Sequence, residues 1–180
     1  MNSSLQSRFI LTLTLRESII AAFTAVLMVA TSTFIRIPIH LPGHRVLMLV
    51  FFLLLGRACA RPFYFATFIG IIAGLLALML GHEPPAHLLN YSIAGVISDL
   101  SFHLLPSRRY PILVSPIAGG LIGASWVPAS FLMDQLAGMD LIFAFTHSLF
   151  KFTWAIVFGL LGGILSGAVQ LRLRSSHIIV

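Results

Sequence analysis

Six apolar stretches, separated by short polar segments, occupy nearly the whole of this chain. A run of about 20 apolar residues is long enough to cross the hydrocarbon core of a bilayer as a helix. We therefore expect an all-α integral membrane protein, because no connection is long enough to hold a soluble domain. The pattern predicts a single six-helix transmembrane domain over residues 1–180, with helices near 17–35, 46–59, 62–81, 86–105, 110–133 and 140–171.

The segments between these stretches alternate between basic and nearly neutral. Four of them carry arginine pairs: Arg8 and Arg16, Arg57 and Arg61, Arg108 and Arg109, Arg172 and Arg174. The other three hold Arg36, Arg45, Glu83, Asp134 and Asp140. Lys and Arg in short loops are retained on the cytoplasmic side of a membrane. The alternation therefore predicts cytoplasmic N- and C-termini, with the first, third and fifth connections outside.

Composition agrees with a membrane protein. A mean hydropathy of +1.02 and only 9% charged residues exclude an ordinary soluble domain, in which about a quarter of the residues are charged. The net charge of +6 is explained by arginines that anchor the topology beside anionic lipid headgroups, rather than by nucleic-acid binding. The polar first fifteen residues lack a cleavage pattern, so we expect the first helix to be retained and not removed as a signal peptide.

The sequence contains no familiar catalytic or phosphate-binding motif. A Gly-rich phosphate loop, an HExxH pair, a GxSxG elbow and a carboxylate pair are all missing, and the single cysteine, Cys59, cannot form an internal disulfide. His40 and His44 have the spacing of a helical metal site, but Pro42 and Gly43 between them break a helix. We therefore predict a binding protein rather than an enzyme, with no metal and no cofactor.

Small residues recur at four-residue spacing on several predicted helices. The clearest repeat is Gly159, Gly163 and Gly167 on the sixth helix, and the first helix carries Ala21 and Ala25. Such faces let helix backbones approach closely in lipid. They either pack inside the protein or dock another membrane subunit, and the Ala21/Ala25 face is the best docking candidate.

Three ionisable residues fall inside the predicted helices. Lys151 lies eleven residues into the sixth helix with His147 one turn closer to the outside, and Asp99 lies thirteen residues into the fourth. Charged side chains at membrane depth usually have partners or functions. Two interpretations stay open: Lys151 pairs with Asp99, or Lys151 and His147 point into a pocket that opens outward and holds an anionic or hydrogen-bonding ligand.

Asn90 and Tyr91, near the outer start of the fourth helix, could form the other wall of that pocket. The Asn90 side chain both donates and accepts hydrogen bonds, which suits a heterocyclic or amide ligand. Asp134, at the outer end of the fifth helix, is either a rim residue of the pocket or a loop charge, and we favour the loop charge. From the outer face inward we expect a rim of His40, His44 and His87, then Asn90 and Tyr91, then His147, and Lys151 deepest.

The chain resembles the substrate-binding (S) component of energy-coupling factor (ECF) transporters. The resemblance is carried by Ala21-xxx-Ala25, by the outer loop Ile37-Pro38-Ile39-His40-Leu41-Pro42-Gly43, by a short second helix ending in Leu55-Gly56-Arg57, by Asn90 and Gly95 on the fourth helix, and by the Gly-rich segment from Leu160 to Gly167 before Arg172. It covers nearly the whole chain and adds the expectation of an S-component-like bundle.

The resemblance implies a subunit of the bacterial or archaeal cell membrane that binds a vitamin or similar micronutrient. Its partners would be a transmembrane coupling subunit, docked on the Ala21/Ala25 face, and two ATPase subunits. The ligand would contact the first outer loop and helices four to six, through His40, His44, Asn90, Tyr91, His147 and Lys151. Nickel- and cobalt-binding members have a histidine after the initiator methionine, where this chain has Asn2, so a metal substrate is not expected.

Two other functions remain open from the sequence. One is a small membrane scaffold similar to the bacterial shape-determining proteins, which also lack catalytic motifs. The other is an intramembrane enzyme that uses His147 and Lys151, although no nucleophile lies within the same turn. A lysine on the sixth helix is similar to that of biotin-type S components, but the sequence does not identify the ligand.

Overall fold

The protein is described by a computed structural model over residues 13–34, 44–60, 62–81, 86–105 and 110–175. These ranges contain six helices: α1 (Leu15–Phe34), α2 (His44–Ala58), α3 (Phe65–Met79), α4 (Ala86–Leu104), α5 (Pro111–Leu136) and α6 (Leu141–Ser175). Each begins and ends within four residues of its predicted bounds. α1, α5 and α6 are long and apolar enough to cross a membrane by length and composition.

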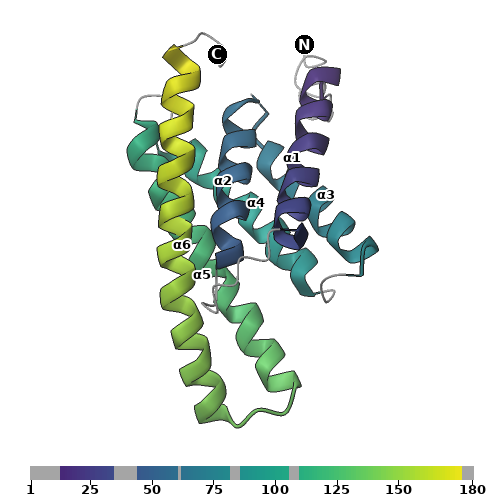
Figure 1. Ribbon diagram of the computed structural model, residues 1–180, viewed down its shortest axis with the longest axis vertical. Coiled ribbons are helices and arrows are strands. Elements are labelled where there is room, and N and C mark those ends of the chain that lie inside the picture. Colours follow the sequence, from purple (N-terminus) through teal and green to yellow (C-terminus); the bar gives the residue numbers. More distant parts are fainter. Residues whose placement is uncertain (1–12, 35–43, 61, 82–85, 106–109, 176–180) are drawn as a thin grey trace, which may run out of the picture.

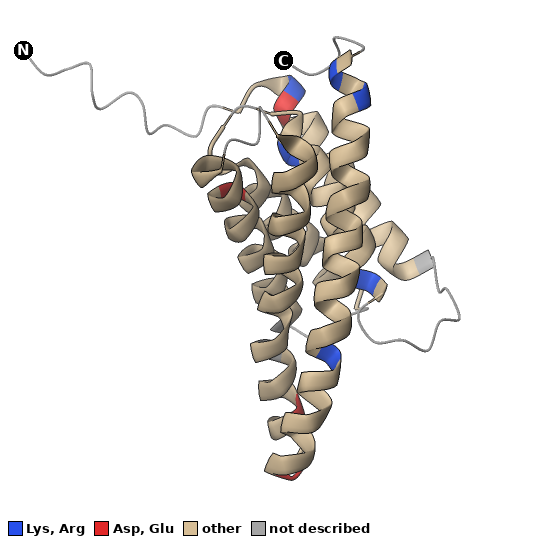
Figure 2. Cartoon of the chain, turned by 90° about the vertical axis from the view of Figure 1, so that its left-hand side faces the viewer, with Lys and Arg blue, Asp and Glu red and all other residues tan. Residues whose placement is uncertain are grey.

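The helices lie side by side in a bundle, and the α5–α6 hairpin extends beyond the other helices at one end (Figure 1). We call this the hairpin end; it contains the turn at residues 137–140. The opposite end, which we call the basic end, is where α1 begins and α6 ends. It carries Arg16 in the first turn of α1, Arg57 in the last turn of α2, and Arg172 and Arg174 in the last turn of α6. Figure 2 shows blue Lys and Arg residues gathered at this end. Among the described residues, the arginines of the basic segments thus lie together at one end of the bundle, opposite the turn that joins α5 to α6.

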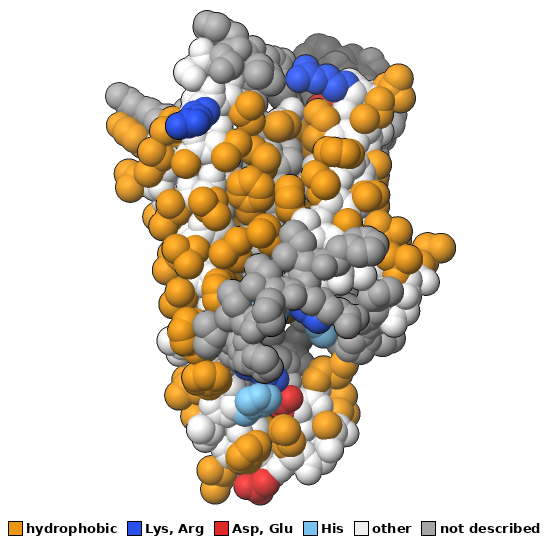
Figure 3. Space-filling model, viewed as in Figure 1, with side chains coloured by type: hydrophobic (Ala, Val, Ile, Leu, Met, Phe, Trp, Pro, Cys, Tyr) orange, Lys and Arg blue, Asp and Glu red, His pale blue; other side chains and the backbone are white. Residues whose placement is uncertain are grey.

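The second helix lies at the centre of the bundle. It packs against all five other helices, and none of the large hydrophobic side chains exposed in the described ranges belongs to it. The other helices expose leucine, isoleucine, valine or phenylalanine side chains, and hydrophobic atoms cover much of the face seen in Figure 3. An apolar surface of this extent is typical of contact with lipid or another apolar partner rather than with water.

The helices α5 and α6 are joined by a glycine seam. A methyl group added to Gly119 would overlap the carbonyl oxygen of Gly159, and one added to Gly159 would overlap that of Gly119. One turn to either side, Gly123 faces the carbonyl oxygen of Ala155 and Gly163 faces that of Ser115. Only glycine allows this direct backbone contact, so the glycine repeats of these two helices serve internal packing.

Ala21 and Ala25 also face the interior. Both are 0% exposed and belong to the hydrophobic core of the bundle. The predicted docking face is therefore covered by other helices of the same chain, as in the internal-packing interpretation. A partner subunit cannot contact these two alanines in this arrangement.

Asp99 on α4 lies near the basic end, where it caps the beginning of α3. Its carboxylate accepts hydrogen bonds from the backbone N–H groups of Ala66 (3.1 Å) and Thr67 (2.8 Å) and from the Thr67 hydroxyl (2.8 Å). Its Oδ1 atom also lies 2.7 Å from Nε of Arg57. The first N–H groups of a helix have no partner within the helix and carry partial positive charge, so a buried carboxylate is stabilised there.

These contacts exclude one of the two interpretations left open by the sequence, the Lys151–Asp99 pair. Asp99 is 2% exposed and is held by Arg57 at the end of α2, whereas Lys151 lies toward the hairpin end of α6. That interpretation fails because it measured depth by counting residues from each helix start. α6 is 35 residues long and extends past the start of α4, so equal counts do not mean equal depth.

A second buried polar group joins three helices in the same half of the bundle. The side-chain amide of Gln170, 2% exposed, donates hydrogen bonds to the carbonyl oxygen of Leu54 (3.3 Å) and to the hydroxyls of Ser115 (3.4 Å) and Ser166 (3.0 Å). Most of the described buried polar side chains near the basic end are thus engaged within the chain, and this half of the molecule is held together by packing and polar contacts at once.

Candidate ligand-binding site at the hairpin end

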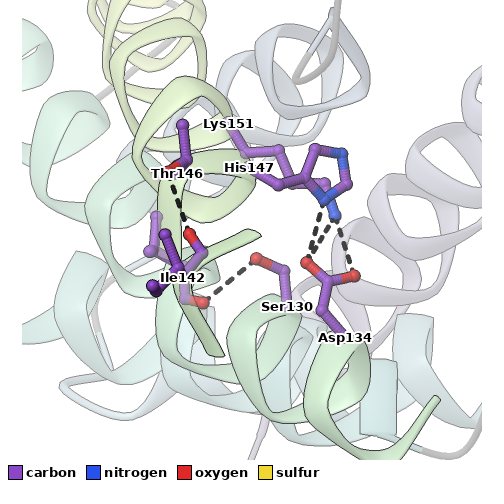
Figure 4. Close-up of polar contacts among 7 residues, drawn as sticks. Ser130, Asp134, Ile142, Thr146, His147 and Lys151 are labelled. Carbon is purple, nitrogen blue, oxygen red and sulfur yellow. Dashed lines mark hydrogen bonds and ion pairs between the residues drawn. The ribbon is translucent and has the colours of Figure 1, made fainter. Parts of the chain in front are cut away.

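A charged group joins α5 and α6 near the hairpin end (Figure 4). The carboxylate of Asp134 lies 3.2 and 3.3 Å from Nζ of Lys151 and 3.1 Å from Nδ1 of His147. His147 and Lys151 are one turn apart, so their side chains leave the same face of α6. The three side chains are 14%, 28% and 38% exposed for Asp134, Lys151 and His147, which makes the group half-buried rather than a surface ion pair.

Asp134 was interpreted from the sequence as a loop charge, and the structure instead makes it the partner of both predicted ligand residues. The reason is that α5 continues to Leu136, three residues beyond the predicted end of that helix. A helical hairpin with a short turn brings the last turn of one helix beside the first turns of the next. Because this relationship follows from the sequence alone, it could have identified Asp134 as a partner of His147 and Lys151.

An aromatic and polar cluster lies between α4 and α5. The rings of His87 and Tyr91, one turn apart on α4, both meet the Trp126 ring of α5 edge-on, at centroid separations of 5.6 and 5.9 Å and interplanar angles of 78° and 74°. Tyr91 and Asn90 are 2% and 3% exposed. Trp126 was not among the predicted site residues, because nothing in its local sequence distinguishes it from a lipid-facing tryptophan.

Several buried polar atoms at this end have no hydrogen-bond partner within the described part of the chain: Asn90 Oδ1, His87 Nδ1, Trp126 Nε1, Gln135 Nε2 and Ser148 Oγ. Ser98 Oγ, nearer the basic end, is also without a partner there. An unsatisfied buried polar group costs about 1–3 kcal/mol, and natural proteins keep few of them. Their concentration at one end is the most unusual feature of this bundle, and a bound ligand or water would satisfy them.

The register of α5 against α6 relates the two clusters. Gly123 packs against Ala155, so Trp126, one turn after Gly123 on α5, lies at about the level of Lys151, one turn before Ala155 on the antiparallel α6. His87 and Tyr91, which contact Trp126, share this level. We predicted that Lys151 would be the deepest residue of a layered pocket. In the structure it instead lies at about the same level as the aromatic cluster. Figure 3 shows charged and histidine side chains gathered in this lower part of the molecule.

Two predicted ligand residues lie in or beside the first connection. His40 lies outside the described residues. His44 is the first residue of α2, whose Leu47 carbonyl oxygen packs against Gly162 of α6, about three turns from Lys151 toward the basic end. The structure thus brings together Asn90, Tyr91, His87 and Trp126 in one cluster and His147, Lys151 and Asp134 in another, and contact of His44 with a ligand stays a prediction.

The described residues contain no group of three or more histidine, cysteine, aspartate or glutamate side chains arranged to hold a metal ion. The clusters above instead offer hydrogen-bond donors and acceptors beside aromatic rings, which suits a small organic ligand. The chain matches no protein-family model, and no curated protein or solved structure is significantly similar to it. The arrangement of these side chains is therefore the principal guide to what the protein does.

Proposed function

We propose that this chain is the substrate-binding membrane subunit of an ECF-type importer, which captures a vitamin or similar micronutrient at the outer face of the cell membrane. It would deliver the ligand inward together with a transmembrane coupling subunit and two ATPase subunits. The observation that carries the proposal is the concentration of buried, unpartnered polar atoms on α4, α5 and α6 at the hairpin end. A protein that only spans or scaffolds a membrane gains nothing from keeping them.

The orientation follows from charge. If the basic end is cytoplasmic, as the arginines favour, the hairpin end meets the outside and a ligand would arrive there first. Lys151 precedes Arg172 by 21 residues, or about 32 Å along a helix, which equals the hydrocarbon thickness of a typical bilayer, about 30 Å. Lys151 and its partners would then lie at the outer boundary of the membrane, where a charged group costs much less than at the centre.

All six helices would cross the membrane in this proposal. α2 and α3 have 15 residues each, about 23 Å at 1.5 Å per residue. Their flanking residues and local thinning of the bilayer would make up the difference. The central position of α2 also supports the proposal, because a helix surrounded by protein need not match the lipid thickness by itself.

The test is to purify the tagged protein from its native membrane, release bound small molecules by denaturation and measure them by mass spectrometry. We expect one compound in about equimolar amount, together with a coupling subunit and two ATPases in the mildest detergent. A matched preparation of Asn90→Leu controls for compounds carried over by lipid. Co-purification of wall-synthesis proteins with no small molecule would contradict transport and favour the scaffold function.

A further inference from the structure

We propose that the ligand of this site is an uncharged, planar molecule that presents an amide or lactam edge, an N–H donor beside a carbonyl acceptor. This inference rests on the proposed function, since it assumes that the clusters at the hairpin end bind a small molecule, and it specifies which chemical class they accept. Of the two ligand classes that the sequence left open for Lys151 and His147, anionic or hydrogen-bonding, it selects the second.

The charge balance of the site argues against an anionic ligand. Lys151 approaches both carboxylate oxygens of Asp134, at 3.2 and 3.3 Å, and His147 approaches one of them at 3.1 Å. The ammonium charge is therefore already neutralised by a half-buried carboxylate of the same chain. A ligand carboxylate at Lys151 would have to displace Asp134 or lie beside it, and two carboxylates at one site repel each other.

The unpartnered atoms of the aromatic cluster define a complementary pattern. Asn90 Oδ1 is an acceptor and requires an N–H or O–H group, whereas Trp126 Nε1 can only donate and requires a carbonyl oxygen or ring nitrogen. His87 Nδ1, one turn before Tyr91, can serve in either role according to its tautomer. Asn90 comes three residues after His87, so the two side chains are neighbours on α4, and the His87 ring contacts the Trp126 ring. A ligand that lies across these neighbours with one donor beside one acceptor, as in an amide or lactam, satisfies both fixed groups.

The shape of the cluster favours a flat ligand. His87 and Tyr91 both stand edge-on to Trp126, at 78° and 74°, so ring faces and ring edges together line this part of the α4–α5 interface. Aromatic rings contact one another best in offset-stacked or edge-to-face arrangements. A planar ring would extend the arrangement already present, while a branched aliphatic chain would not.

Binding can be measured through Trp126 itself. Trp154, the second of the two tryptophans, contacts the Phe150 and Phe158 rings on α6, so Trp154→Phe leaves Trp126 as the sole tryptophan. We would titrate this variant in nanodiscs with matched neutral and anionic probes: uracil against orotate, and benzamide against benzoate. Orotate is uracil with an added carboxylate, and benzoate has a carboxylate in place of the amide of benzamide. The ring is the same within each pair.

The expected result is a saturable change of Trp126 emission with uracil or benzamide and at least tenfold weaker binding of the carboxylate partner. Trp126→Phe, in protein with Trp154 retained, should weaken neutral binding at least tenfold when measured calorimetrically, because the indole N–H is lost while an aromatic ring remains. Lys151→Met should change neutral binding less than threefold. Circular dichroism and gel filtration identify any variant that fails to fold.

Two results would overturn the inference, and they separate it from the function on which it rests. Tighter binding of orotate or benzoate, lost in Lys151→Met, would contradict the neutral ligand class and leave the binding function standing. Equally, a compound released from the native preparation that carries a carboxylate and no amide or lactam would contradict the class alone. Absence of any released compound and of any probe binding would overturn both proposals.

Discussion

Gly119 of α5 and Gly159 of α6 lie so close together that a methyl group on either would overlap the carbonyl oxygen of the other. Gly120, the next residue on α5, is in a different position, since a methyl group there would meet only the Leu160 side chain, at 3.2 Å. The two neighbouring glycines therefore form a natural pair for measuring how much the helix contact contributes.

We expect Gly119→Ala to lower the free energy of unfolding by about 1–3 kcal/mol, because the added methyl group forces the two backbones apart. Gly120→Ala is the matched control and should change stability by less than about 0.5 kcal/mol, because a leucine side chain can move. Thermal unfolding of both variants in the same detergent measures the difference. Equal losses at the two positions would contradict the backbone contact.

Asp99 and Asp134 should respond very differently to replacement. Asp99→Leu leaves the buried Arg57 without its carboxylate and the first N–H groups of α3 without their acceptor. We expect a loss of about 3–5 kcal/mol, as for other broken buried ion pairs. Asp134→Leu removes a partner from Lys151, which is 28% exposed and can still reach water, so it should cost about 1–2 kcal/mol, between the values for exposed and for buried pairs. Denaturant unfolding of the two variants compares them, and a greater loss at Asp134 would reverse this ranking.

Asn90→Leu should stabilise the ligand-free protein while abolishing ligand binding. The two side chains are similar in size, and leucine replaces a buried amide whose oxygen has no partner within the described ranges. Relief of that unsatisfied group is worth up to about 1–3 kcal/mol. The melting temperature measured without ligand would show the gain. A lower melting temperature than wild type would instead make the Asn90 amide a structural group.

Cysteine labelling can test the orientation. In a Cys59→Ser background, Ala137→Cys in the α5–α6 turn should react with a membrane-impermeant maleimide on intact cells. Ser175→Cys at the end of α6 should react only after permeabilisation. Both positions are exposed in the structure. The reverse pattern of labelling would invert the proposed topology.

In the wild-type protein, which retains Cys59, the native thiol should itself react slowly. Burial raises the pKa of the Cys59 thiol above its ordinary value, and the smaller opposing effect of Arg16 does not reverse this. Because only the thiolate reacts, a raised pKa means that less of Cys59 is reactive at neutral pH. Wild-type protein should therefore label slowly even after permeabilisation, and labelling of Cys59 should accelerate as the pH rises.

The helices could be predicted from the sequence because apolar runs of sufficient length have few alternatives to helix in a membrane. The contacts between the helices could not be predicted in this way. Depth counted along single helices paired Lys151 with Asp99, and nothing in one sequence reveals that α6 extends beyond its neighbours. Asn90 and Tyr91 were predicted from their polarity, whereas Trp126 was missed because an aromatic residue in an apolar helix has no distinguishing signal until its neighbours are known.

The cap that Asp99 provides for α3 has a consequence for the synthesis of the protein. α3 is made before α4, yet the N–H groups at its start and the charge of Arg57 before it receive their carboxylate from α4. In the proposed six-span topology, those groups would have no partner in the chain while α3 alone has left the ribosome, and they would favour water or the insertion machinery. The hairpin of α3 and α4 should therefore enter the membrane as one unit, with Asp99 acting as the group that completes its insertion.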